Sequence, residues 1–126
     1  MIEGVVTPER EAVLRLTVRG PQNQEQEIEV IVDTGFNDYL TLAPDQVAAL
    51  GLPFAAPTRA TLADGSEIEL NYHRATVLWD GAPRSVLVLA CEGGALVGMS
   101  LLYGHEMYVH VVDGGRVTIT PNNASA

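Results

Sequence analysis

Apolar and polar residues alternate along most of this chain, and Gly, Pro and Asp-Gly pairs interrupt the alternation at short intervals. A period of two is typical of β-strands that bury one face, and Asp-Gly pairs favour tight hairpin turns. The pattern predicts hairpins that turn at residues 20–23, 64–65, 80–81 and 113–115. The strands expected in them are residues 13–19, 25–32, 59–63, 66–70, 76–79, 84–90, 107–112 and 116–120.

Only two segments have the pattern of a helix, and both are short. Pro44 suits a first helical turn, Asp45 complements the helix dipole, and Gly51 fits the stop after residue 50. The second helix is expected at residues 99–103. Many short strands and turns in one small chain favour a closed barrel or sandwich, so we predict an all-β fold of short antiparallel strands with one or two short helices.

Length and composition set the scale of the fold. The chain has 126 residues, of which 47% are hydrophobic, and this is enough for one domain with its own core. We therefore expect a single domain over residues 1–126. The tail at residues 121–126 has no apolar anchor and is expected to be flexible.

The charge and the cysteine count narrow the range of partners. There are 16 acidic residues against 7 basic ones, all Arg and scattered, so nucleic acid is not an expected partner. Cys91 is the only cysteine, and the simplest interpretation is either a reducing compartment or a protein that is indifferent to redox conditions. The N-terminus does not resemble a secretory signal, and the longest apolar stretch, residues 86–91, is far shorter than the roughly 20 residues of a membrane-spanning helix. We expect a soluble, cytoplasmic protein that does not bind a membrane.

The chemically informative segment is Asp33-Thr34-Gly35, which directly follows the apolar residues 30–32. Asp and Gly form strands poorly, so the triplet by itself also fits a turn that ends a strand. A second signal lies much further along the chain, where the apolar pair Leu96-Val97 precedes Gly98 and a short helix. The hairpin at residues 64–65 lies between the two signals.

The order of these three segments resembles that of the single-domain retroviral-like aspartic proteases. Residues 36–42 and the short helix that ends at residues 50–52 are similar to the prokaryotic branch of that family. The resemblance extends over roughly residues 13–120. It implies a retropepsin-like closed barrel and an aspartic endopeptidase that uses no metal and no cofactor.

The resemblance also implies a homodimer, because each chain carries one Asp33 and the chemistry requires two carboxylates that face each other. Thr34 and Gly35 would support this pair. The hairpin at residues 59–70 would be a flap that closes over an extended peptide, although an Asp-Gly turn also fits an ordinary exposed hairpin. The residues that would contact the peptide or protein substrate are Gly35, Phe36, Asn37, Asp38 and, at the flap tip, Ala63, Asp64 and Gly65.

Several positions depart from the viral pattern. The flap tip has one glycine, Gly65, where the viral enzymes have several, and Phe36 replaces a small residue. Asn37 and Met99 are neutral where the viral enzymes pair an acid with an arginine. Loss of both charges together leaves no lone buried charge, although ordinary sequence drift explains the two neutral residues nearly as well. Because Phe36 would crowd or line a side-chain pocket, the substrate preference of the viral enzymes does not transfer to this chain.

Other kinds of site have weaker support in the sequence. His73, His105 and His110 lack a metal-ligand spacing, and no serine lies in a Gly-x-Ser-x-Gly elbow. A competing hypothesis is a non-catalytic peptide-binding or dimerisation module on the same fold, although a pure binder gains nothing from two repelling carboxylates. Another hypothesis, an acidic regulatory partner similar to an antitoxin, rests on size and charge alone.

Overall fold

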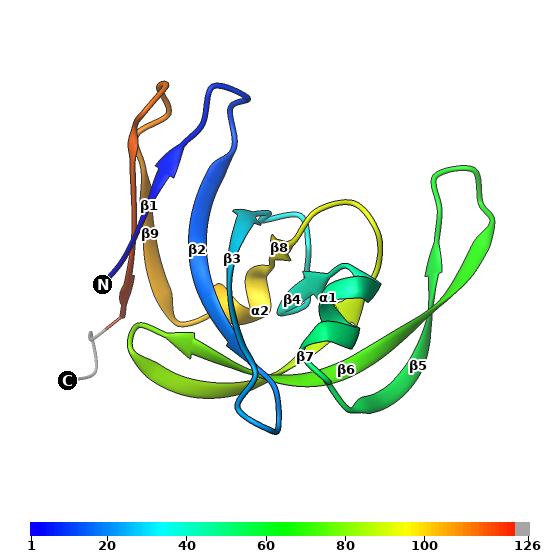
Figure 1. Ribbon diagram of the computed structural model, residues 1–126. Helices are drawn as coiled ribbons and strands as arrows, with labels where there is room; N and C mark the ends of the chain where they lie inside the picture. Colours follow the sequence, from blue (N-terminus) through cyan, green and yellow to red (C-terminus); the bar gives the residue numbers. More distant parts are fainter. Residues whose placement is uncertain (123–126) are drawn as a thin grey trace.

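The computed structural model describes residues 1–122 and consists mainly of β-strands with two short helices (Figure 1). The strands are β1 (Ile2–Val6), β2 (Ala12–Arg19), β3 (Glu25–Val32), β4 (Leu40–Leu42), β5 (Phe54–Thr61), β6 (Glu67–Trp79), β7 (Ala82–Ala90), β8 (Leu96–Val97), β9 (His105–Val109) and β10 (Arg116–Pro121). The helices are α1 (Pro44–Ala49) and α2 (Met99–Leu102). The predicted all-β fold with short helices is confirmed.

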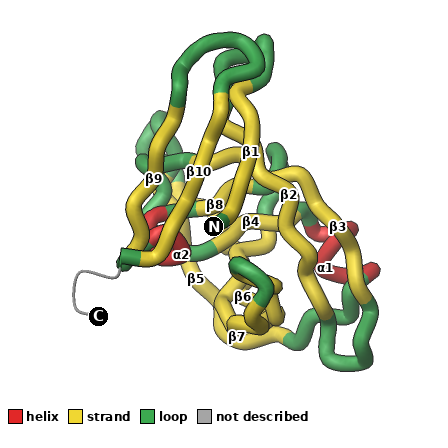
Figure 2. The backbone as a smooth tube through the Cα atoms, turned by 90° about the vertical axis from the view of Figure 1, so that its left-hand side faces the viewer, coloured by secondary structure: helices red, strands yellow, loops and turns green. Residues whose placement is uncertain are grey.

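All of these strands belong to one sheet, in the order β5-β6-β7-β4-β8-β3-β2-β1-β10-β9. Because β2 also pairs with β6, the strands from β6 to β2 close into a ring. β5 extends beyond the ring at one end, and β1, β10 and β9 extend beyond it at the other, where they lie side by side (Figure 2). Within residues 1–122 the predicted barrel is thus a ring of strands with two open edges, and not a true barrel.

Two of the pairings are parallel, whereas the sequence pattern predicts antiparallel strands throughout. β3 pairs in parallel with β8, and β4 pairs in parallel with β7. A parallel pair requires a long crossover connection, so the hairpin signals in the sequence cannot reveal it. β8 also pairs with β4, antiparallel, so it lies between β3 and β4 in the sheet, beside the place where β3 ends.

The structure corrects several predicted boundaries. β6 is one strand of 13 residues, where the pattern predicts two separate strands at residues 66–70 and 76–79. Its middle part carries polar and half-exposed side chains because that part joins the projecting β5–β6 hairpin to the ring. The short strands β1, β4 and β8 are not predicted, since two to five residues contain too little alternation to be recognised.

The hydrophobic core fills the inside of the ring. Its fully buried side chains include Leu14, Val18, Val30, Leu40, Leu42, Val77, Val88, Val97 and Leu101. Burial of each such side chain stabilises the fold by roughly 1.5–3 kcal/mol. Because β3, β4 and β8 all contribute to this core, the loop that follows β3 begins from a rigid support.

The ends of the short elements follow from local hydrogen bonds. The Ala43 carbonyl oxygen accepts from the N–H of Val47 at 3.1 Å, and Gly51 ends the helical segment at a φ of +62°, as the sequence predicts for α1. At the C-terminus, Pro121 belongs to β10 and the N–H of Asn122 donates to the Gly104 carbonyl oxygen at 2.8 Å. The rest of the predicted flexible tail, residues 123–126, lies outside the described residues. Neither α1 nor α2 has the length and apolar character of a helix that crosses a membrane.

Candidate active site

Asp33 lies at the end of β3, where the chain leaves the sheet beside β8. Its backbone N–H donates to the Val97 carbonyl oxygen at 2.9 Å, which continues the parallel pairing of Val32 with Val97. The N–H of Gly35 donates to Asp33 Oδ1 at 2.9 Å, so the loop itself orients the carboxylate, which stays partly exposed. The two motifs that the sequence analysis singled out are therefore neighbours in space.

Gly98 allows the loop after Asp33 to contact the start of α2. A Cβ atom at this position would lie 2.2 Å from the Asp38 carbonyl oxygen and 2.7 Å from the Phe36 carbonyl oxygen. The N–H of Gly98 donates to the Tyr39 carbonyl oxygen at 3.0 Å, and the N–H of Met99 donates to the Phe36 carbonyl oxygen at 2.8 Å. The lack of a side chain at Gly98 thus lets these bonds fasten the loop to α2.

Thr34 and Gly35 form the exposed outer part of the loop. Thr34 lines a hollow of about 270 Å³, whose other walls include Met99, Tyr103 and Met107 from α2, its C-terminal end and β9. These three large apolar side chains are exposed. An apolar surface therefore adjoins the loop that carries Asp33.

Asp38 is bound by a tyrosine of β6. The hydroxyl of Tyr72 donates to Asp38 Oδ2 at 2.6 Å. This hydrogen bond, with smaller contributions from burial and from the negative charge of Asp38, raises the pKa of Tyr72 to about 12. Asp38 is thus held by the protein itself and links the loop to the base of the β5–β6 hairpin.

The positions that depart from the viral pattern lie next to this loop. Phe36 is half-buried, and a Cβ atom at Gly98 would lie 2.6 Å from its Cδ2 atom. Asn37 and Met99 are both exposed and line one hollow of about 340 Å³, together with Arg84. Arg84 donates to a backbone carbonyl oxygen of α2 at 3.1 Å. A cation of β7 therefore braces α2 beside the two neutral residues.

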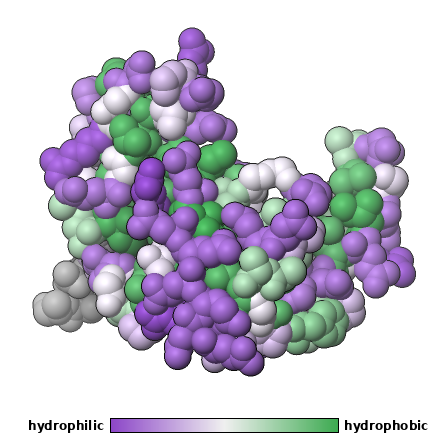
Figure 3. Space-filling view, viewed as in Figure 1, coloured by the Kyte–Doolittle hydropathy of each residue, from purple (hydrophilic) through white to green (hydrophobic). Residues whose placement is uncertain are grey.

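The predicted flap is the hairpin of β5 and β6, and its tip residues Ala63, Asp64 and Gly65 are exposed. Gly65 has a φ of +85°, which favours glycine, and hydrogen bonds from the Ser66 hydroxyl and N–H lower the pKa of Asp64. The hairpin stands apart from the end of β3, with a hollow between them (Figures 1 and 3). The structure thus brings Asp33, Thr34, Gly35, Phe36, Asn37 and Asp38 together in one loop, but it does not bring the flap tip onto them.

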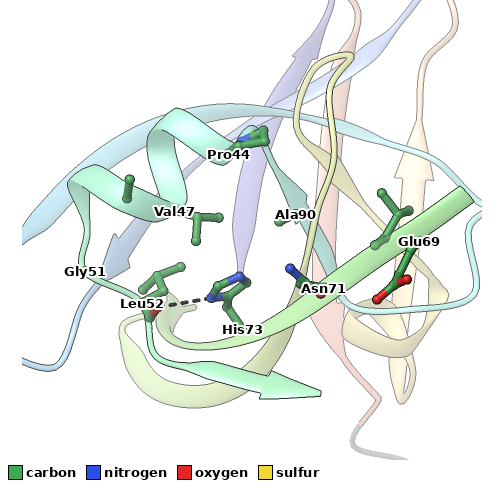
Figure 4. Close-up of a pocket in the computed structure, with 10 residues that line it drawn as sticks. Pro44, Val47, Gly51, Leu52, Glu69, Asn71, His73 and Ala90 are labelled. Carbon is green, nitrogen blue, oxygen red and sulfur yellow. Dashed lines mark hydrogen bonds between the residues drawn. The ribbon is translucent and has the colours of Figure 1, made fainter. Parts of the chain in front are cut away.

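A separate hollow of about 470 Å³ lies between α1 and β6 (Figure 4). Val47, Leu52 and Ala90 contribute apolar walls, and Asn71 and His73 contribute polar ones. His73 Nδ1 lies 3.1 Å from the Leu52 carbonyl oxygen, so this ring is already hydrogen-bonded within the protein. No residue of the Asp33 loop lines this hollow, which is therefore separate from the candidate active site.

Sequence reasoning missed two side chains that shape the site. Tyr72 lies between the two strands expected at residues 66–70 and 76–79, yet its hydroxyl binds Asp38. Thr41 is buried, and its Oγ1 atom donates to the Gly94 carbonyl oxygen at 3.3 Å and accepts from the Leu96 N–H at 2.8 Å. It therefore positions the start of β8. The only sign in the sequence is a hydroxyl residue between two leucines, and this does not identify its distant partners.

Comparisons with known proteins give one informative result. No protein-family model and no curated protein matches this chain. Among solved structures, the EIAV protease complexed with the inhibitor HBY-793 is similar, with a TM-score of 0.56 and 15% sequence identity over 75% of this chain and 88% of that chain. At this identity the likeness shows the fold alone. It confirms the predicted retropepsin-like fold class.

Proposed function

We propose that this chain is one half of a homodimeric aspartic endopeptidase, in which each chain supplies one catalytic Asp33. The observation that carries this proposal is the setting of Asp33 on a retropepsin-like fold: a partly exposed carboxylate at the end of a core strand, oriented by the N–H of Gly35. The exposed Thr34 and the apolar surface beside it leave the half-site open toward a second chain.

The chemistry of two facing Asp33 side chains follows from their mutual repulsion. Two carboxylates a few ångströms apart do not both ionise readily, so the pair holds one shared proton. The ionised carboxylate takes a proton from a water molecule that attacks the peptide carbonyl carbon, and the protonated one donates its proton toward the developing oxyanion. The apparent pKa values of this step belong to the pair and not to either residue.

The substrate groove in this proposal is the hollow between the Asp33 loop and the β5–β6 hairpin. Side chains on a strand alternate between two faces, so Ile68 and Leu70 share the face of Tyr72, which reaches Asp38 in the loop. Closure of the hairpin would place this apolar face over an extended peptide and exclude water. The contacts predicted for the flap tip would form only in that closed state.

The test is the cleavage of a peptide library from acidic to neutral pH by the wild type and by Asp33→Asn. We expect Asp33→Asn to lose activity by on the order of a thousandfold or more while its fold and dimerisation stay intact. Asp45→Asn is the matched control, because it removes an acid from α1, outside the Asp33 loop. Unchanged cleavage by Asp33→Asn would refute the mechanism. Failure of both folded proteins to cleave would favour the non-catalytic peptide-binding module.

The remaining parts of the proposal rest on the sequence. A peptide or protein is the expected substrate, and no cofactor, nucleic acid or membrane takes part. A cytoplasmic location is proposed from the lone Cys91. Placement in the prokaryotic branch rests on residues 36–42 and 50–52.

A further inference from the structure

Arg84 differs from the other arginines of this chain in its surroundings. Four of the seven arginines form ion pairs with glutamates. Arg10, Arg74 and Arg84 form none within residues 1–122, and of these three only Arg84 is half-buried. A half-buried cation has lost part of its hydration, so it gains more from a nearby counter-charge than an exposed cation does. Arg84 is therefore the arginine that most lacks a carboxylate partner.

The guanidinium of Arg84 is held in place by its neighbours and still has donors to offer. Its Nη1 atom donates to the Leu101 carbonyl oxygen in α2 at 3.1 Å, and its Cζ atom lies 5.8 Å from the centre of the Tyr39 ring. A guanidinium carries several N–H donors in a rigid planar fork, and this fork matches the two oxygens of a carboxylate. The bond to Leu101 uses one of these donors, so a group that is already positioned remains able to bind a carboxylate.

The hollow beside Arg84 has no acidic wall. It has a volume of about 340 Å³, and the residues that line it are Asn37, Tyr39, Arg84, Met99, Ser100 and Tyr103. None of these residues is acidic, although the chain has 16 acidic residues. Asp38 lies close by in the sequence, but its carboxylate accepts the hydroxyl hydrogen of Tyr72 and does not line the hollow. The hollow therefore keeps a local positive charge in a chain whose net charge is −9.

The other walls of the hollow suit a carboxylate on a short apolar stem. The side-chain amide of Asn37 forms no hydrogen bond within residues 1–122, and Tyr103 is 84% exposed, so both can donate to a ligand. The Ser100 hydroxyl donates to the Asn37 carbonyl oxygen at 2.5 Å and fixes the wall between the loop and α2. Met99 and the Tyr39 ring offer apolar atoms to methylene groups. A glutamate side chain has this combination of groups.

We propose that this hollow binds an acidic side chain of the peptide substrate through Arg84, which makes Arg84 a specificity-determining residue. This inference rests on the proposed function, because a peptide that lies over Asp33 brings the acidic side chain to the hollow. Asn37 lies four positions after Asp33 in the same loop. Since a chain spans at most about 3.6 Å per residue, Asn37 lies within roughly 14 Å of Asp33, a distance that about four residues of an extended peptide cover. The acidic residue is therefore expected within a few residues of the cleaved bond.

The overall charge of the chain predicts the opposite preference. A protein with a net charge of −9 attracts basic peptides and repels acidic ones. This general effect acts on every position of the peptide and weakens with salt, because the Debye length is only about 10 Å at 0.1 M. A preference for an acidic residue at one fixed position therefore identifies a local cation and not the charge of the whole chain.

Cleavage of a peptide library by charge variants tests the preference. We expect the wild type to favour glutamate over glutamine at one position by about tenfold in kcat/KM, mainly through KM, and Arg84→Gln to lose this preference. Arg84→Glu should favour lysine or arginine at the same position, a reversal that a loss of folding cannot produce. Arg84→Lys keeps the charge without the fork and should retain part of the preference. Arg74→Gln is the matched control, because it removes an unpaired arginine that does not line the hollow.

A binding experiment separates this inference from the proposed function. The same library is passed over immobilised Asp33→Asn, which is expected not to cleave, and over the double variant that also carries Arg84→Gln. Enrichment of glutamate peptides on the first protein alone would support the hollow, even if no protein cleaves anything and the enzyme is thereby refuted. Cleavage that depends on Asp33 but shows no acidic preference, or the same preference in Arg84→Gln, would leave the endopeptidase standing and overturn the role of Arg84.

Discussion

Substitution of Gly98 by alanine tests the way in which the Asp33 loop is held. The added Cβ would lie 2.2 Å from the Asp38 carbonyl oxygen and 2.6 Å from Phe36 Cδ2, so the loop must move away from α2. This displacement weakens the hydrogen bonds from Gly98 and Met99 to the loop carbonyls. Overpacking typically costs about 1–3 kcal/mol, and each of the two weakened hydrogen bonds adds about 0.5 kcal/mol. We expect a total loss of about 3 kcal/mol.

Chemical and thermal denaturation measure this loss. For a domain of this size a loss of about 3 kcal/mol lowers the midpoint temperature by roughly 10 °C. Gly35→Ala is the matched control from the same loop, since its Cβ would meet only Asp33 Oδ1, at 3.3 Å. Gly35→Ala should therefore lose less than about 1 kcal/mol. If Gly98→Ala were as stable as Gly35→Ala, the loop would not be fastened as the structure describes.

Two further substitutions test single side chains of the site. Thr41→Val should destabilise the fold by about 2 kcal/mol, because it leaves the partly buried Leu96 N–H without its acceptor, and Thr41→Ser should restore most of this in the same urea titration. Tyr72→Phe should cost about 1 kcal/mol after allowance for its partial exposure. Since the pKa of Tyr72 is raised to about 12, the folded state retains this proton above pH 10, and the stabilisation should be present below pH 10 and fall as the pH rises toward 12. Ultraviolet titration should show one tyrosine ionising near pH 12 in the wild type and none there in Tyr72→Phe, and a wild-type titration without this step would contradict the hydrogen bond to Asp38.

The local elements of the fold follow from the sequence wherever the signal is short-range. The hairpin between β2 and β3 turns at residues 20–23, as the alternation and the turn residues predict. α1 starts at Pro44 and the chain turns at Gly51, because these two residues have strong conformational preferences of their own. The pattern fails in β6, where a continuous strand crosses from the hairpin to the ring and its exposure changes along its length.

Part of the candidate site was predictable as well, because Asp33-Thr34-Gly35 and Leu96-Val97-Gly98 are short-range signals in the sequence. The order of Asp33-Thr34-Gly35 and Leu96-Val97-Gly98 implies their roles through resemblance, and the parallel pairing of β3 with β8 brings them together. The bond from Tyr72 to Asp38 and the position of Thr41 join residues far apart in the sequence. Neither bond leaves a periodic signal, because each depends on how separate strands are placed.

The sequence by itself determined the β-rich composition of the fold, its main turns and the identity of the one aspartate in an Asp-Thr-Gly triplet. These features depend on backbone preference and on the alternation of burial, which act over a few neighbouring residues. Only the tertiary structure decided which strands close the ring, how Gly98 fastens the Asp33 loop, and that, within residues 1–122, β9 lies at one end of the sheet. Those features arise from contacts between distant segments, whose partners are selected by the packing of the whole core.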